Sequence, residues 1–154
     1  MFDGAAFIGA LSQLFDIWNL ILMVAGVGLG IIVGVSPGLG APLGIAIALP
    51  FTFYMGGEQS FALLLGIYSG SIYGGSISAI VLGIPGTPPA AATVLDGHPM
   101  FRQGRASEAL TLSLIGSVIG GLFSTLILAL LAPLLAAFAL RFGPPEYFVL
   151  GVVG

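Results

Sequence analysis

Charged side chains interrupt an otherwise apolar chain at only a few points and leave three long uncharged stretches between them. These stretches cover residues 17–57, 59–95 and 109–140. Each is longer than the roughly 20 apolar residues that a helix needs to cross a hydrocarbon core. A charge at mid-bilayer costs about 2.5 to 3.5 kcal/mol, so the charged positions mark the connections between spans. The pattern predicts membrane-spanning helices over residues 17–35, 60–82 and 109–131.

Composition agrees with this pattern. Only 6% of the residues are charged and 58% are hydrophobic, whereas soluble domains carry about 25% charged residues. We therefore predict an all-α fold, a polytopic transmembrane helix bundle that lies in the lipid bilayer as a single membrane domain over residues 1–154. Within it we expect an interfacial helix over residues 1–16, spans and broken helices over residues 17–142, and the start of a further segment over residues 143–154.

Charge and cysteine content exclude several classes of function. The formal net charge of -3 argues against a nucleic-acid partner, because nucleic-acid-binding proteins present basic surfaces. The chain contains no cysteine, which excludes disulfides and cysteine-based metal sites. Its only histidine, His98, has no cluster of carboxylates beside it in the sequence. We expect His98 to be an exposed or interfacial loop residue rather than a metal ligand.

The stretch from Gly34 to Gly38 reads Gly-Val-Ser-Pro-Gly and matches the GxSxG pattern of serine hydrolases. In a nucleophile elbow, the N–H of the residue after the serine forms half of the oxyanion hole. That residue is Pro37 here, and proline has no N–H. The general base would also have to be His98. We therefore predict that the chain is not an enzyme.

Two rows of glycines recur every four residues within the first two predicted spans. The rows are Gly26, Gly30, Gly34 and Gly66, Gly70, Gly74. Small residues at this spacing share one face of a helix and let two helix backbones approach closely within a membrane. Helix packing is the expected role of each of these glycines.

Prolines interrupt the apolar pattern at two places. Residues 37–55 contain Pro37, Pro42 and Pro50, and a proline in a helix interior costs about 3 kcal/mol. This segment is therefore not expected to be one continuous membrane helix. We expect it to be broken, re-entrant or covered by other protein, because free backbone polar groups cannot face lipid. The same combination of proline and glycine returns over residues 82–91, LGIPGTPPAA.

Residues 95–108, LDGHPMFRQGRASE, hold two of the three arginines and are predicted to form a cytoplasmic loop by the positive-inside rule. Asp96 followed by glycine indicates a cap or turn there. The orientation of the chain depends on residues 43–55. If they cross the membrane as a short span, the N-terminus lies outside, which we favour. If they are re-entrant, it lies inside.

Interrupted membrane helices expose backbone N–H groups at one broken end and carbonyls at the other. Transporters use such ends to hold anionic substrates and coupling cations. Small hydroxyl side chains near the breaks would add hydrogen bonds or cation ligands. They are Ser36, Thr52, Ser69, Ser71, Ser76, Ser78, Thr87 and Thr93. The alternative is that each hydroxyl bonds to a carbonyl of its own helix.

Three segments carry a resemblance to a known family: GVSPGLGAPLGIAIALPFTF, LLLGIYSGSIYGGSISAIVLGIPGTPPAAATVLDGHPM and FGPPEYF. In this order and spacing they resemble the large membrane subunit of tripartite tricarboxylate transporters, the TctA family. The resemblance implies a multi-pass secondary transporter of the bacterial inner (cell) membrane, a symporter driven by an ion gradient. Tricarboxylates or related carboxylates would be its substrates. It also implies two partners, a small membrane subunit and a periplasmic substrate-binding protein. No cofactor is implied other than Na⁺ or H⁺ as a coupling ion.

The resemblance also implies site residues at the two breaks. For substrate binding they are Ser36, Pro37, Gly38, Gly40 and Pro42 in the first break, and Pro85, Gly86, Thr87 and Pro88 in the second. The possible cation ligands are Ser76, Ser78 and Thr52. Two positions depart from the family pattern, since Ser36 stands where an apolar residue is expected and His98 where tyrosine is usual. Family members are several times longer, so the chain would be the N-terminal portion, one half of a repeat-built transporter.

Two functions are consistent with these patterns. One is a permease subunit of a binding-protein-dependent secondary transporter for carboxylates. The other is a non-transporting membrane scaffold or assembly subunit, whose glycine faces only dock partner helices. A scaffold needs the glycine rows but has no use for prolines in mid-membrane. The permease hypothesis predicts weaker substrate binding for Gly38→Ala and Thr87→Val, and a smaller effect for Arg141→Ala.

Overall fold

The computed structural model describes residue 9, residues 15–139 and residues 143, 149 and 152. The predicted interfacial helix over residues 1–16 and the predicted further segment over residues 143–154 fall almost entirely outside these residues, and so does Arg141. The chain divides into two compact units, Met1–Leu114 and Ile115–Gly154. Each unit is described by itself.

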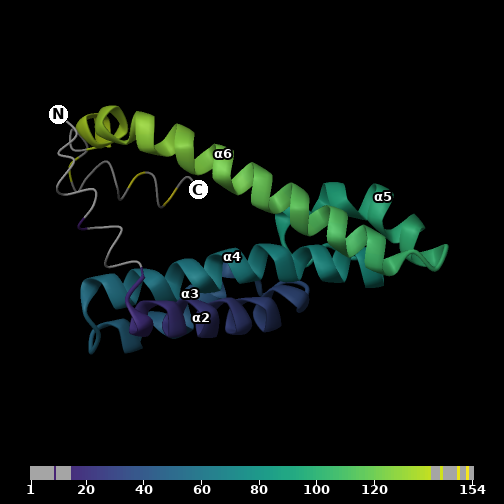
Figure 1. The fold of residues 1–154 in the computed structure, drawn as a ribbon, viewed down its shortest axis with the longest axis horizontal. Helices are drawn as coiled ribbons and strands as arrows, with labels where there is room; N and C mark the ends of the chain where they lie inside the picture. The colour runs from purple at the N-terminus through teal and green to yellow at the C-terminus, as the bar shows by residue number, and fades with distance from the viewer. Residues whose placement is uncertain (1–8, 10–14, 140–142, 144–148, 150–151, 153–154) are drawn as a thin grey trace. The chain divides into compact units, whose positions relative to one another are not determined.

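The described residues form helices connected by short turns (Figure 1). The helices are α2 (Ile17–Val35), α3 (Gly40–Thr52), α4 (Gly57–Leu82), the 3₁₀ helix η1 (Pro88–Ala90), α5 (Ala91–Arg102) and α6 (Ala106–Ala139). Among the described residues there is no strand. Three helical segments are long and apolar enough to cross a membrane, namely α2, α4 and residues Ala106–Ala132 of α6. The predicted fold class, an all-α membrane helix bundle, is confirmed.

The three predicted spans correspond to these three helices. The first agrees at both ends, the second begins at Gly57 instead of residue 60, and the third extends past both predicted ends. The side chain of Gln59 accepts the backbone N–H of Gly56 at 3.3 Å, which explains the earlier start of α4. Asp16 caps α2 in a similar way, because its carboxylate accepts the N–H of Trp18 at 3.2 Å.

Helix α2 ends where the sequence places its first proline. Ser36 has φ -82° and ψ 110°, the extended conformation that a following proline favours. Gly38 and Gly40 then adopt positive φ values of 89° and 60°, which glycine reaches without a steric penalty. Helix α3 starts at Gly40. The predicted break in residues 37–55 is therefore a tight turn at residues 36–39, and the following residues form a short helix.

Helices α2 and α4 run parallel and pack backbone to backbone along the two glycine rows. A Cβ added to Gly26 or Gly30 would meet the carbonyl oxygen of Leu63 or Ile67, and one on Gly70 would meet the carbonyl of Val27. Later residues of α2 contact later residues of α4, so the two helices run in the same direction. The expected packing role of the rows is confirmed in this contact.

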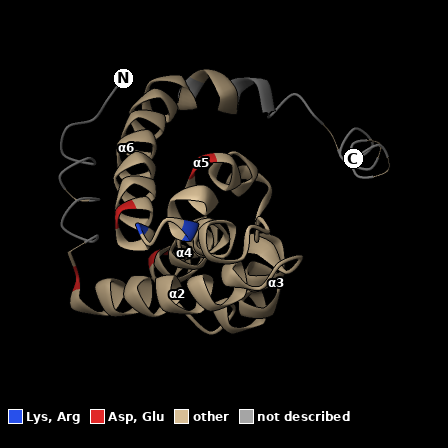
Figure 2. Ribbon diagram, turned by 90° about the vertical axis from the view of Figure 1, so that its right-hand side faces the viewer, with Lys and Arg blue, Asp and Glu red and all other residues tan. Residues whose placement is uncertain are grey.

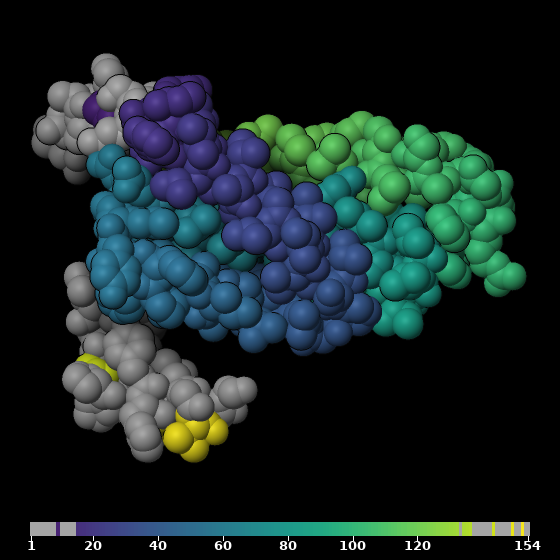
Figure 3. All heavy atoms as spheres, turned by 90° about the horizontal axis from the view of Figure 1, so that it is seen from below, coloured from purple at the N-terminus to yellow at the C-terminus, as the bar shows by residue number. Residues whose placement is uncertain are grey.

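Helix α3 carries the chain back along α2 and α4. At 1.5 Å per residue its 13 residues extend about 20 Å, less than the roughly 30 Å of a hydrocarbon core. Ala48 of α3 packs with Leu63 and Ile67 of α4 in the apolar core. Figure 3 shows α2 and α3 side by side on one face of the first unit.

The second break folds back against α4. Gly83 ends this helix with φ 70° in the left-handed region. The chain then returns along α4, because the N–H of Gly86 donates to the carbonyl of Gly75 at 3.3 Å. From there η1 and α5 run outward along the last turns of α4, where Gly97 packs on Ile80. Residues 83–102 thus fold back along α4 and then run out again, and we call them the re-entrant segment.

The predicted loop over residues 95–108 is wrong for most of its length, because α5 continues to Arg102. Gly97 was interpreted as part of a turn, but it lies within α5 and leaves room for the Ile80 side chain. A Cβ at this position would lie 2.7 Å from the Ile80 side chain. His98 is half-buried instead of exposed in a loop. Its Nδ1 donates to the Ile80 carbonyl at 3.0 Å, a carbonyl in the last turn of α4 that lacks a partner within its own helix.

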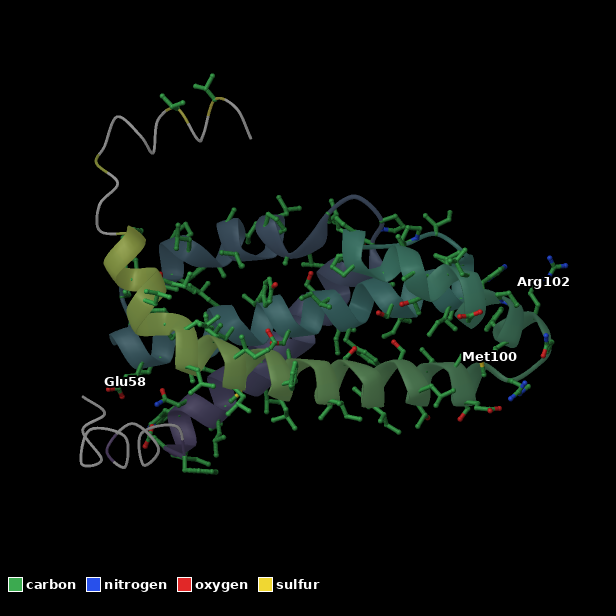
Figure 4. All side chains as sticks on the ribbon, turned by 90° about the horizontal axis from the view of Figure 1, so that it is seen from above. Glu58, Met100 and Arg102 are labelled. Carbon is green, nitrogen blue, oxygen red and sulfur yellow. The ribbon has the colours of Figure 1, made fainter. Side chains whose placement is uncertain are left out.

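Charged residues are sparse along the ribbon (Figure 2). Figure 4 places Glu58 at one end of the first unit and Met100 and Arg102 at the opposite end. Arg105, in the turn after α5, forms a bidentate pair with Glu108, with N···O distances of 2.7 and 2.6 Å. Apart from Asp96 in the middle of α5, the charged residues of this unit that the structure describes lie near the ends of its helices.

Candidate functional site

Helix α4 extends past the end of α2, so the positions of the two breaks can be compared along it. Gly74 packs against Ile31 and Val35, the last turn of α2. Gly75, the residue that receives the second break, precedes the end of α4 at Leu82 by two helical turns, about 10 Å. Both breaks therefore reach the same level of α4, well before the helix ends.

The two breaks meet at this level. A Cβ on Gly86 would collide with the carbonyl oxygen of Gly34, and it would lie 2.6 Å from Ser78 Oγ and 2.9 Å from Gly75 Cα. The last turn of α2, the re-entrant segment and α4 are therefore in direct contact. We call this contact the break junction, and it consists of Gly34, Ser71, Gly75, Ser78, Gly86 and Thr87.

Two hydroxyl groups in the break junction are buried without a hydrogen-bond partner among the described residues, Ser71 Oγ and Thr87 Oγ1. Ser71 has 0% of its surface exposed and Thr87 has 5%. Thr87 Oγ1 occupies the place that a Cβ on Gly75 would take. Because Cα–Cβ bonds tilt toward the start of a helix, this place lies over the turn that begins at Ser71. Buried polar groups are nearly always hydrogen-bonded, so two exceptions in one contact are unusual.

The other hydroxyls near the breaks bond to carbonyls of their own helices. Ser78 donates to Gly75 at 3.0 Å and Ser76 to Ile72 at 3.5 Å. Thr52 donates to Leu49 at 2.7 Å, and it lies at the far end of α3, beside Ser60 and away from the break junction. Of the three predicted cation ligands, Ser78 alone belongs to the break junction. Ser76 is buried on α4 nearby.

The first break differs in its exposure and in the groups it presents. Pro37 and Gly38 are exposed and Ser36 is half-buried, with its hydroxyl donating to the Ile32 carbonyl at 3.4 Å. Pro42 lies in the first turn of α3, where proline costs no hydrogen bond. Leu39 is right-handed and Gly40 left-handed, a sequence of conformations that directs successive N–H groups into one concavity and favours an anion.

The second break offers fewer backbone donors. Pro88 and Pro89 occupy the first positions of η1 and have no N–H. Pro85 and Pro88 are exposed, whereas Gly86 and Thr87 are buried. The predicted substrate residues therefore differ in exposure: the prolines and Gly38 are exposed, Ser36 and Gly40 are half-buried, and Gly86 and Thr87 are buried, with Gly86 against the end of α2.

Sequence reasoning missed two members of the break junction as site residues, Gly34 and Gly75. Gly34 was assigned to helix packing, and it does pack on Ser71. Its carbonyl, in the last turn of α2, also points at Gly86. The available signal was position, because Gly34 ends the first glycine row and Gly75 follows the last glycine of the second, both at the level of the breaks.

Interrupted helices meet at the level of Gly75, beside apolar helices long enough to span a bilayer. This arrangement defines a class of protein, the all-α membrane proteins with broken and re-entrant helices. A comparison with protein-family models matches the Tripartite tricarboxylate transporter TctA family over residues 20–154. The chain belongs to this family, which confirms the resemblance found in the sequence. The name of the family describes transporters, in agreement with the expectation of a non-enzymatic protein.

One curated relative gives a second comparison. The chain is 47% identical over 136 residues to an uncharacterized 52.8 kDa protein in the TAR-I ttuC′ 3′ region of Agrobacterium vitis. The alignment covers 88% of this chain and 27% of that protein, so the chain spans about a quarter of the length of the relative it matches. No solved structure matches the chain.

Proposed function

We propose that the chain forms the N-terminal part of the large membrane subunit of a binding-protein-dependent secondary transporter. This transporter takes up tricarboxylates or related carboxylates across the bacterial inner membrane and is driven by an ion gradient. A small membrane subunit and a periplasmic substrate-binding protein are its proposed partners. Membership in a family of tripartite transporters supports the existence of partner subunits.

The observation that carries the proposal is the meeting of two interrupted helices at Gly75. An uninterrupted helix that spans the membrane pairs its backbone groups at membrane depth and leaves none there to bind a polar solute. Broken helices at membrane depth provide helix ends with free polar groups, and secondary transporters place substrate and ion sites at such ends. The glycine turn before α3 presents N–H groups of Gly40 and Ala41, together with the positive end of the α3 dipole, to a carboxylate.

The parallel packing of α2 and α4 supports an N-terminus outside the cell. A parallel pair requires the chain to return to the starting side between them, so α3 acts as the short crossing segment. With Arg102 and Arg105 on the cytoplasmic side, the N-terminus lies outside. In a cysteine-free background, a membrane-impermeant maleimide should label Tyr54→Cys from the periplasm and should not label Arg102→Cys. The reverse result would invert the orientation.

The scaffold alternative loses the support of the glycine rows on α2 and α4 in this fold. The glycine rows of α2 and α4 face each other, and a Cβ on Gly30 or Gly70 would collide with the partner helix. These faces are therefore occupied within the chain and are not available to dock partner helices.

Reconstitution of the complete transporter in liposomes tests the proposal. Uptake of a panel of carboxylates should be measured with the binding protein present, under imposed gradients of Na⁺ or H⁺. We expect uptake of at least one carboxylate that depends on the binding protein and on one of the gradients. Absence of uptake for every carboxylate and gradient, from a folded complex, would contradict the proposed function.

A further inference from the structure

We propose that the break junction holds a dehydrated Na⁺ ion, with the carbonyl oxygen of Gly34 and the hydroxyl oxygens of Ser71 and Thr87 as ligands. The inference rests on the proposed function, because it assigns an ion site to the same transporter. It selects Ser71 and Thr87 from the hydroxyls near the breaks in place of Ser76, Ser78 and Thr52, of which Thr52 lies away from the break junction.

The buried hydroxyls provide the first argument. A hydroxyl that is buried without a partner costs about 1 to 3 kcal/mol, and Ser71 and Thr87 each bury one. A cation that accepts lone pairs from both oxygens offsets this cost. Ser78 does not need such a partner, because its hydroxyl already donates to the Gly75 carbonyl.

The helix end provides the second argument. Gly34 is the next-to-last residue of α2, and the last four carbonyls of a helix have no partner within it. They also form the negative end of the helix dipole, which favours a cation. Gly34 contacts Ser71, and it also contacts Gly86, the neighbour of Thr87. Its carbonyl therefore lies in the same packed contact as both hydroxyls.

The chemistry of the break junction favours Na⁺ over other cations. Its side chains are hydroxyls and hydrogens, so none of them titrates near neutral pH and none can bind a proton there. Among the described residues, no cluster of His, Cys, Asp or Glu could hold a metal ion, and divalent cations generally require carboxylates. The packing is close enough that one added Cβ on Gly86 would collide. This favours the smaller Na⁺ over K⁺.

Direct binding of Na⁺ to the complete transporter tests the assignment. Radioactive ²²Na⁺ binding should be measured on the purified complex in the absence of carboxylate, with K⁺ as the competing ion. The variants are Thr87→Val, which removes the oxygen at nearly constant volume, Thr87→Ser, which keeps it, and Ser71→Ala. Thr111→Val is the matched control, because its exposed hydroxyl donates to the Ser107 carbonyl at 2.8 Å on α6.

We expect saturable Na⁺ binding by the wild type, with K⁺ a poor competitor. Thr87→Val and Ser71→Ala should each weaken the affinity by about tenfold or more. Thr87→Ser and Thr111→Val should bind Na⁺ almost as the wild type does. The comparison of Thr87→Ser with Thr87→Val separates loss of the oxygen from a general packing defect.

The inference is overturned if the wild type does not bind Na⁺, if K⁺ competes equally, or if Thr87→Val and Ser71→Ala retain wild-type affinity. Carboxylate uptake by the same preparations separates this result from failure of the proposed function. Uptake that persists while the variants bind Na⁺ normally overturns the ion site alone. Absence of uptake under every gradient overturns the proposed function, whatever the Na⁺ binding.

Discussion

The two breaks contain the same dipeptide, proline followed by glycine, but they use the glycine for different purposes. Gly38 in the first break has φ 89°, and a Cβ on it would meet nothing within 4 Å. Gly86 in the second break has an ordinary φ, and a Cβ on it would collide with three neighbouring groups. The first glycine is needed for its backbone conformation and the second for its lack of volume. A proline-glycine pair in a membrane segment therefore predicts an interruption without specifying its surroundings.

The largest expected effect of a single substitution is that of Gly86→Ala. The new methyl group would press on the Gly34 carbonyl, Ser78 Oγ and Gly75 Cα, which belong to two different helices. No single shift relieves all three collisions. We expect a loss of about 3 kcal/mol or more in the free energy of unfolding, together with loss of carboxylate uptake. Thermal denaturation of the purified transporter in detergent measures the first quantity. Wild-type stability would show that the second break does not pack on α2.

A smaller loss is expected for Gly34→Ala. The three atoms nearest to its methyl group would all be backbone atoms of Ser71, and the end of α2 can move away from this one residue. We expect a loss of about 2 to 3 kcal/mol. Gly28→Ala is the matched control, because Gly28 lies in the same helix and a Cβ on it meets nothing within 4 Å.

The control should stabilise α2 by about 0.5 to 1 kcal/mol, since alanine loses less entropy than glycine in a helix. The stability of both variants should be measured by the same denaturation. Equal stability of Gly34→Ala and Gly28→Ala would contradict the close contact between α2 and α4 at the break junction.

Local patterns were sufficient to predict most of the fold. The uncharged stretches placed α2, α4 and α6, the four-residue spacing predicted the contact of Gly30 and Gly70 with their partner helices, and the prolines placed both breaks. The prediction was wrong at residues 95–102. Asp96 and Gly97 fit a turn locally, but packing of Gly97 against Ile80 holds them in a helix, and such a tertiary contact leaves no local signal.

The site was less predictable than the fold. The sequence indicated the hydroxyls near the breaks but could not rank them, because their hydrogen-bond partners depend on the direction in which each chain segment folds. Ser76 and Ser78 are bonded within α4, whereas the buried hydroxyls of Ser71 and Thr87 have no hydrogen-bond partner among the described residues. The fold-back of residues 83–87 decides this difference. No periodicity in the sequence predicts that residues 83–87 fold back.

The smallest effect is expected for Gly38→Ala, which tests the conformational role of the first break. Alanine at φ 89° costs about 1 to 2 kcal/mol of backbone strain, and the open surroundings add no collision. The fold should persist, with a shifted turn that misdirects the N–H groups before α3. We expect an increased KM for carboxylate uptake with little change in kcat. Gly38→Asn is the matched variant, since asparagine tolerates positive φ better than alanine, and its KM should lie closer to that of the wild type. An equal increase in KM for both variants would show that side-chain volume, and not backbone conformation, governs the first break as it does the second.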